Sequence, residues 1–118
     1  MILVRATALA ALLLATACAA PEKREDAPSQ DTIACALDGQ RIVIRFLPDE
    51  VRLLTPDGER VVLQKVPAAA GVRYTNGLVE LRSGGGTGAA AQGLLFVRDG
   101  TGYALTGCAP VMVPQPAR

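Results

Sequence analysis

The chain has 118 residues, a formal net charge of +1 and no histidine. This length suits one small domain, and the near-zero charge gives no reason to expect a nucleic acid or anionic lipid as partner. The missing histidine excludes the commonest general base and metal ligand. Half of the residues are hydrophobic but only 3% are aromatic, so we expect a modest, aliphatic core.

Residues 1–17 have the features of a secretory signal peptide. Arg5 gives a positive start, and the uncharged run that follows is shorter than the ~20 apolar residues that a membrane-spanning helix needs. The run ends in Leu-Ala-Thr-Ala-Cys at residues 14–18, which resembles the bacterial lipoprotein cleavage box. We therefore predict that Cys18 is acylated. The alternative is an ordinary signal peptide followed by a chance Cys.

Acylation of Cys18 would place the mature chain on a membrane, facing the periplasm. Because Ala19 is not Asp, the sorting rule for such lipoproteins predicts the outer membrane. Removal of the leader leaves eleven basic and eleven acidic side chains, a balanced surface.

Two segments flank the expected fold. Residues 18–31 combine mixed charges with two prolines and no apolar period, which predicts a flexible tether. Residues 110–118 are apolar but interrupted by prolines, which predicts a tail without regular structure. The folded domain is therefore expected at residues 32–109.

From Thr32 onward, hydrophobic residues alternate with a period of two, as in half-buried strands. Turn signals such as Asp38-Gly39 and Asn76-Gly77 separate the alternating segments. We expect an all-β fold, a small antiparallel β-barrel of about eight strands. The glycine-rich stretch Ser83–Gly93 is expected to be a long mobile loop. The strands are predicted at residues 33–37, 42–47, 51–55, 60–66, 72–74, 78–82, 94–98 and 103–106.

Cys35 and Cys108 stand near opposite ends of the predicted domain. In an oxidising periplasm two such thiols most often pair, and a bridge would close a loop of a little over 70 residues worth ~4 kcal/mol. The alternative is a pair of buried, unpaired thiols. Without histidine or a Cys-x-x-Cys pair, the sequence predicts no metal site and no cofactor.

Several segments, in order and rough spacing, resemble the bacterial membrane-bound inhibitors of c-type lysozyme. They are Cys35 with Asp38-Gly39, Thr55–Gly58, Leu63–Pro67, Gly71–Gly77 and Cys108. The resemblance covers about residues 33–109 and includes the lipoprotein signal. It implies an eight-stranded barrel, a bridge between the first and last strands, and a c-type lysozyme as protein partner.

The resemblance also implies a partner-binding surface, with two departures from the family pattern. The surface comprises Ala70, Gly71, Arg73, Tyr74, Arg82, Ser83 and Gly84. Ala70 and Gly84 occupy the positions of the Ser and Lys that enter the acidic lysozyme cleft in the family. Arg82 projects from the same strand face as Gly84.

We hypothesise that Arg82 replaces the missing Lys, with Ser83 or Thr75 offering a hydroxyl. The alternatives are that Arg82 is a solvated surface residue and that Tyr74 packs its ring locally.

The sequence contains no residue pattern that predicts an enzyme. Ser29 and Ser83 lack a neighbouring base, and Asp57 is a turn residue. The resemblance therefore implies an envelope lipoprotein that inhibits c-type lysozyme by inserting barrel loops into its acidic cleft. The alternative is a structural or assembly lipoprotein that retains the barrel without inhibition.

Overall fold

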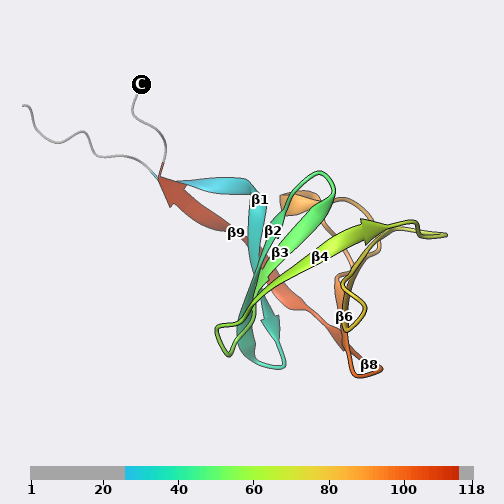
Figure 1. Ribbon diagram of the computed structural model, residues 1–118. Coiled ribbons are helices and arrows are strands. Elements are labelled where there is room, and N and C mark those ends of the chain that lie inside the picture. The colour runs from blue at the N-terminus through green and yellow to red at the C-terminus, as the bar shows by residue number, and fades with distance from the viewer. Residues whose placement is uncertain (1–25, 115–118) are drawn as a thin grey trace, which may run out of the picture.

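Nine antiparallel strands and one short 3-10 helix make up residues 26–114, the part of the chain that the computed structural model describes (Figure 1). The predicted signal peptide, Cys18, the tether up to residue 25 and residues 115–118 lie outside the described residues. The elements are β1 (Asp26–Leu37), β2 (Gln40–Phe46), β3 (Glu50–Leu54), β4 (Arg60–Val66), β5 (Val72–Thr75), β6 (Val79–Ser83), η1 (Gly88–Ala90), β7 (Leu95–Arg98), β8 (Thr101–Ala104) and β9 (Thr106–Pro114).

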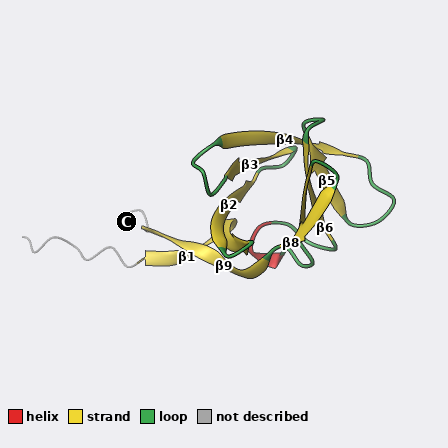
Figure 2. Cartoon of the chain, turned by 90° about the horizontal axis from the view of Figure 1, so that it is seen from below, coloured by secondary structure: helices red, strands yellow, loops and turns green. Residues whose placement is uncertain are grey.

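The strands form one sheet that curls into a half-barrel, in the order β8-β7-β6-β5-β4-β3-β2-β1-β9 (Figure 2). Every neighbouring pair is antiparallel, which confirms the predicted fold class. Consecutive strands from β1 to β8 pair with each other, most of them across short turns and β6 with β7 across the glycine-rich loop. The exception is β9, which pairs with β1 at the other end of the sequence.

The expected last strand at residues 103–106 is where β8 ends and β9 begins. Leu105 alone separates the two strands, and its side chain is buried. Its N–H donates to the carbonyl of Leu94 at 3.0 Å. The segment thus pairs first with β7 and then with β1, so it bends across the curl and counts as two strands.

Alternate residues of the predicted strands point into the curl, as the period of two predicts. Ile42, Ile44 and Phe46 of β2 are buried while Arg41 and Arg45 are exposed. One continuous cluster forms the core: Ile33, Cys35, Ile42, Ile44, Phe46, Val51, Leu53, Leu63, Tyr74, Leu81, Leu94, Phe96 and Leu105. The core is mainly aliphatic, as the composition indicates.

The first and last strands along the chain both extend beyond the expected domain. β1 begins at Asp26, inside the expected tether, and β9 continues to Pro114, inside the tail that was expected to lack regular structure. The register pairs Asp26 with Pro114 and Ala27 with Val113. Each segment supplies the other's pairing partner, which no local sequence pattern reveals.

The expected mobile loop Ser83–Gly93 is instead packed. It contains η1 and an isolated bridge between Gly85 and Gln92. Gly88, with φ +60°, approaches the backbone carbonyl of Gln30 so closely that a Cβ atom would clash with it. The loop is therefore fixed against a bulge in β1.

The predicted disulfide between Cys35 and Cys108 is present. It joins β1 to β9 across 73 residues of sequence, with the two Cα atoms 4.1 Å apart. Cys35 belongs to the core, whereas Cys108 lies at the surface. The bond therefore fastens the end of the chain to the first strand.

Removing this bond by Cys108→Ala should lower the free energy of unfolding by about 4 kcal/mol, because the unfolded chain gains the entropy of an open 73-residue loop. Urea unfolding of both proteins, with and without reductant, measures the difference. Reductant should destabilise the natural chain and leave the variant unaffected. Equal unfolding midpoints without reductant would contradict this role of the bridge.

Candidate functional site

The β4–β5 loop borders a hollow of about 290 Å³ that collects several of the predicted partner-binding residues. Arg73 of β5 lies directly opposite Arg82 of β6, so their stems rise side by side from one sheet face. The hollow is lined by Pro67, Ala68, Ala69, Ala70, Val72, Arg73 and Arg82. The structure therefore brings Ala70, Arg73 and Arg82 together.

Glu80 lies between the two arginines. Its Oε2 atom accepts from Nε of Arg82 at 2.9 Å and lies 2.9 Å from Nη2 of the same side chain. Its Oε1 atom forms an ion pair with Nε of Arg73, although no hydrogen bond of good geometry reaches Oε1 within the described residues. The Glu80 side chain is only 10% exposed, against 44% for Arg73 and 55% for Arg82. One buried carboxylate thus positions two half-exposed guanidinium groups.

This cluster can still bind an anion. Arg82 donates its Nε hydrogen to Glu80 and holds Nη2 in ion-pair contact with the same oxygen, whereas a guanidinium group has five N–H donors. The remaining donors are available to an external acceptor, and two arginines against one glutamate leave a net charge of +1. Charge-assisted hydrogen bonds to a carboxylate are the strongest contacts that such a cluster offers.

Gly71 holds the β4–β5 loop against β6. Its φ of +67° is favourable only for glycine, and a Cβ atom there would clash with the carbonyl oxygen of Ser83. The loop therefore touches the end of β6 directly. This contact sets the position of Ala70 beside the arginines.

The two hydroxyls considered as partners of Arg82 are engaged elsewhere. Ser83 is 3% exposed, and its Oγ lies 2.9 Å from the carbonyl oxygens of both Gly85 and Gly86. Thr75 Oγ1 donates to the carbonyl of Val79 at 3.0 Å. Ser83 thus stabilises the glycine-rich turn, and neither hydroxyl is directed outward.

Gly84, the position at which the resemblance implies a Lys in the family, is exposed directly after β6. Its N–H donates to the carbonyl of Gln92 at 2.8 Å. A Cβ atom at Gly84 would lie 3.4 Å from that carbonyl oxygen, an ordinary contact. The backbone therefore has room for a side chain at this position.

Tyr74 belongs to the core and not to the surface. It is 1% exposed and packs edge-on against Phe46, with ring centroids 6.1 Å apart. Burial raises the pKa of its phenol above 10.0. Because side chains alternate along β5, Tyr74 supports from beneath the strand that presents Arg73.

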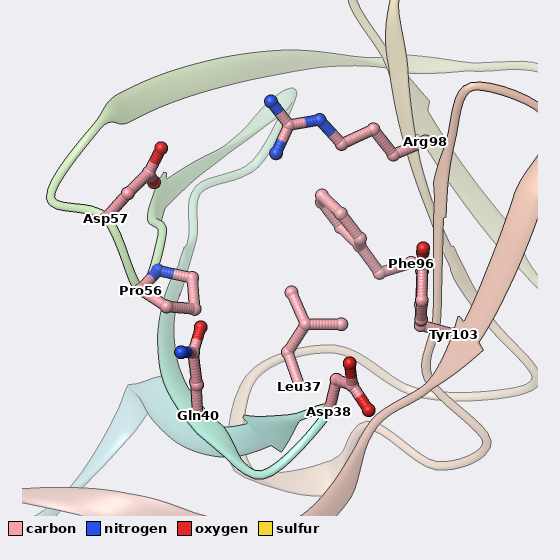
Figure 3. Close-up of a pocket in the computed structure, with 8 residues that line it drawn as sticks. All are labelled: Leu37, Asp38, Gln40, Pro56, Asp57, Phe96, Arg98 and Tyr103. Carbon is pink, nitrogen blue, oxygen red and sulfur yellow. The ribbon is translucent and has the colours of Figure 1, made fainter.

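A second hollow, also of about 290 Å³, lies among the β1–β2, β3–β4 and β7–β8 hairpins (Figure 3). Arg98 is turned toward Asp57 across its mouth. The hydroxyl of Thr55 lowers the pKa of the Asp57 carboxyl, and Arg98 adds a weaker effect in the same direction. The hydrogen bond from Thr55 to Asp57 lies within the β3–β4 turn, so Asp57 has the turn role that the sequence predicts. This hollow contains none of the predicted partner-binding residues. Within residues 26–114 no three acidic or cysteine side chains are grouped to hold a metal ion.

Comparison with protein families matches residues 35–93, half of the chain, to the family described as membrane-bound lysozyme-inhibitor of c-type lysozyme. The chain belongs to this family, which is one of inhibitors and not of enzymes. No curated protein and no solved structure matches the chain. In the described part of the chain, no helix has the length and apolar character needed to cross a bilayer.

Glu80 is the residue of this site to which none of the sequence motifs points. Its position two residues before Arg82 places both side chains on one strand face, which a period-two reading could have found. Its proximity to Arg73 depends on the pairing of β5 with β6, where Glu80 lies opposite Thr75 and diagonal to Arg73. Only the register reveals that one acid serves two arginines.

Changing Glu80→Gln should lower the free energy of unfolding by about 1–3 kcal/mol, because two facing arginines lose the charge between them. Glu59→Gln, at an exposed carboxylate, is the control and should cost less than ~0.5 kcal/mol. Urea unfolding at low and high salt measures both. High salt should reduce the difference in unfolding free energy between the two variants, because it screens the repulsion between the arginines. If the two variants are equally stable at low salt, Glu80 does not position the pair.

Proposed function

We propose that this chain is a lipid-anchored envelope protein that inhibits c-type lysozyme. The inhibiting surface would be the hollow at the β4–β5 loop that Arg73 and Arg82 line, which we call the arginine hollow. Family membership supports a lysozyme-inhibitor role in general. The single observation that carries the mechanism is the placement of Arg73 and Arg82 side by side at the β4–β5 loop, half exposed and held by Glu80.

The chemistry of the partner suits this site. Lysozyme hydrolyses its substrate with two carboxyl groups in one cleft. Arg82 would take the part of the family Lys and donate its free N–H groups to one carboxylate, since the planar guanidinium group matches that geometry. Arg73 would add positive potential beside it. Ala70, Gly71 and Gly84 would form the edge that enters the cleft, with the buried Tyr74 and Ser83 supporting it from beneath.

The glutamate explains how a short surface loop can present two like charges. Without Glu80, the arginines would repel each other and sample many rotamers. Held by Glu80, they lose less entropy on binding. Glu80 also competes with the lysozyme carboxylates, so we expect weaker inhibition than a free Lys at position 84 would give.

We further propose that Cys18 carries the lipid and that the protein faces the periplasm from the outer membrane. The family description as membrane-bound supports attachment to a membrane, and the signal sequence with Ala19 after Cys18 supports the outer one.

Arg82→Ala should raise the inhibition constant for a c-type lysozyme by about 10–100-fold, since it removes a charge-assisted contact. Arg41→Ala, an exposed arginine on β2, is the matched control and should change little. Conversely, Ala70→Ser with Gly84→Lys should lower the constant by about the same factor. The inhibition constants of the natural protein, the two single variants and the double variant are measured from lysozyme turnover of cell-wall substrate, with each purified mature protein in detergent.

Added salt should slow the association of the natural protein with lysozyme more than it speeds dissociation, because steering charges are screened first. The proposal fails if neither the natural protein nor the double variant inhibits at micromolar concentration. The chain would then be a structural or assembly lipoprotein that retains the fold.

Cys18→Ser should abolish acylation and attachment to the outer membrane, because acylation needs the thiol. Mass spectrometry of the N-terminal peptide and fractionation of the envelope measure this result. The natural chain should carry acyl groups and sediment with the outer membrane, whereas the variant should stay unprocessed or be released. Natural protein found free in the periplasm would refute the anchor.

A further inference from the structure

The first residues of β1 and the last residues of β9 form a two-stranded ribbon that projects from the curled sheet (Figure 1). We define the ribbon tip as residues 26–28 with 112–114, which pair with each other in register. A bulge follows in β1, between Pro28 and Ile33, and turns the strand into the body of the sheet. The tip is therefore a separate projection and not part of the core.

The ribbon tip exposes apolar side chains. On β9, residues 109–114 contain no charge, and Met112 and Val113 are 55% and 37% exposed, whereas on β1 the tip carries one charge, at Asp26. Neither residue packs into the core cluster. An isolated two-stranded ribbon gains little stability in water, so these apolar side chains would be stabilised by a covering layer.

A second protein strand is a poor cover. β9 is an edge of the sheet, but Pro110 and Pro114 lack the N–H groups that a partner strand would need, and Pro28 adds a third such position. The six residues of the tip are also far fewer than the 20–30 per partner of a stable protein interface. The tip suits a cover that needs no backbone hydrogen bonds, which a lipid bilayer provides.

The position of the tip relative to the proposed anchor favours a membrane. Cys18 lies eight residues before Asp26, a span of at most about 28 Å for an extended chain. No other part of the described fold is so close to Cys18 along the sequence. The β4–β5 loop, by contrast, lies on the far side of the molecule from the tip in both views (Figures 1 and 2).

We propose that the ribbon tip is a second membrane contact, with Met112 and Val113 entering the interfacial layer of the bilayer. This inference rests on the proposed acylation of Cys18. Because the lipid holds the tip near the surface, even a weak apolar contact becomes populated through its high effective concentration. The contact would direct the arginine hollow away from the membrane, toward a soluble enzyme.

The chain contains no tryptophan, so one introduced indole reports its own surroundings. The acylated M112W protein should be reconstituted in vesicles of phosphatidylethanolamine, phosphatidylglycerol and brominated phosphatidylcholine. Its emission should shift to the blue and be quenched by bromine at least twofold more than that of L78W. Leu78 is the matched control, because it is an apolar residue 83% exposed in the β5–β6 turn.

The outcomes are distinguishable. If the proteins float with the vesicles but both indoles remain equally open to aqueous iodide, the ribbon proposal fails and the anchor stands. If the chain carries no lipid and does not float, the ribbon proposal and the proposed acylation of Cys18 both fail. An M112W indole that is already shielded in micelles, in a particle of twice the mass, would assign the tip to a second copy and overturn the proposal. Lysozyme inhibition by M112W, measured in parallel, tests the proposed function independently.

Discussion

The pairing of β1 with β9, fastened by the Cys35–Cys108 bond, is the constraint on which the rest of the structure depends. Every other neighbouring pair in the sheet is joined by a connection of limited length, whereas this pair joins opposite ends of the described chain. Closing so long a loop has a large entropic cost, which the covalent bond removes from the unfolded state. β9 continues from β8 through the buried Leu105, so the strand held on β1 is joined directly to the hairpin of β7 and β8.

The proposed binding site is an acid-binding surface built around an acid of its own. Glu80 is almost fully buried, and a buried carboxylate is tolerated only when it is paired. Arg73 and Arg82 supply the pairing and still expose about half of their side chains. Glu80 lowers the positive potential of the site but restricts the rotamers of both arginines, so the two cations are already in position when an anion binds.

The same antiparallel topology separates the two surfaces for which we propose partners. The apolar ribbon tip with the first residues of β1 lies on one side, and the β4–β5 loop lies on the other (Figure 1). A lipoprotein attached by a tether alone would sample all orientations. A second contact at Met112 and Val113 would restrict this freedom and keep the arginines accessible to a soluble partner.

The sequence by itself determined the strands, the turns and the two cysteines that pair. Alternation of Ile42, Ile44 and Phe46 required a strand with one buried face, and Asn76-Gly77 required a hairpin. These features are local, so they could be read without knowing any partner strand. The ordered motifs also led to the right family, whose match ends at residue 93.

The tertiary structure alone decided the features that depend on which strands meet. The ribbon of residues 26–28 with 112–114 exists because segments more than 80 residues apart pair, although each separately resembles a linker. The burial of Ser83 follows from the glycine-rich turn that covers it. The neighbourhood of Arg73, Glu80 and Arg82 follows from the register of β5 on β6. Register is set by the packing of the whole sheet, and for that reason no single segment encodes it.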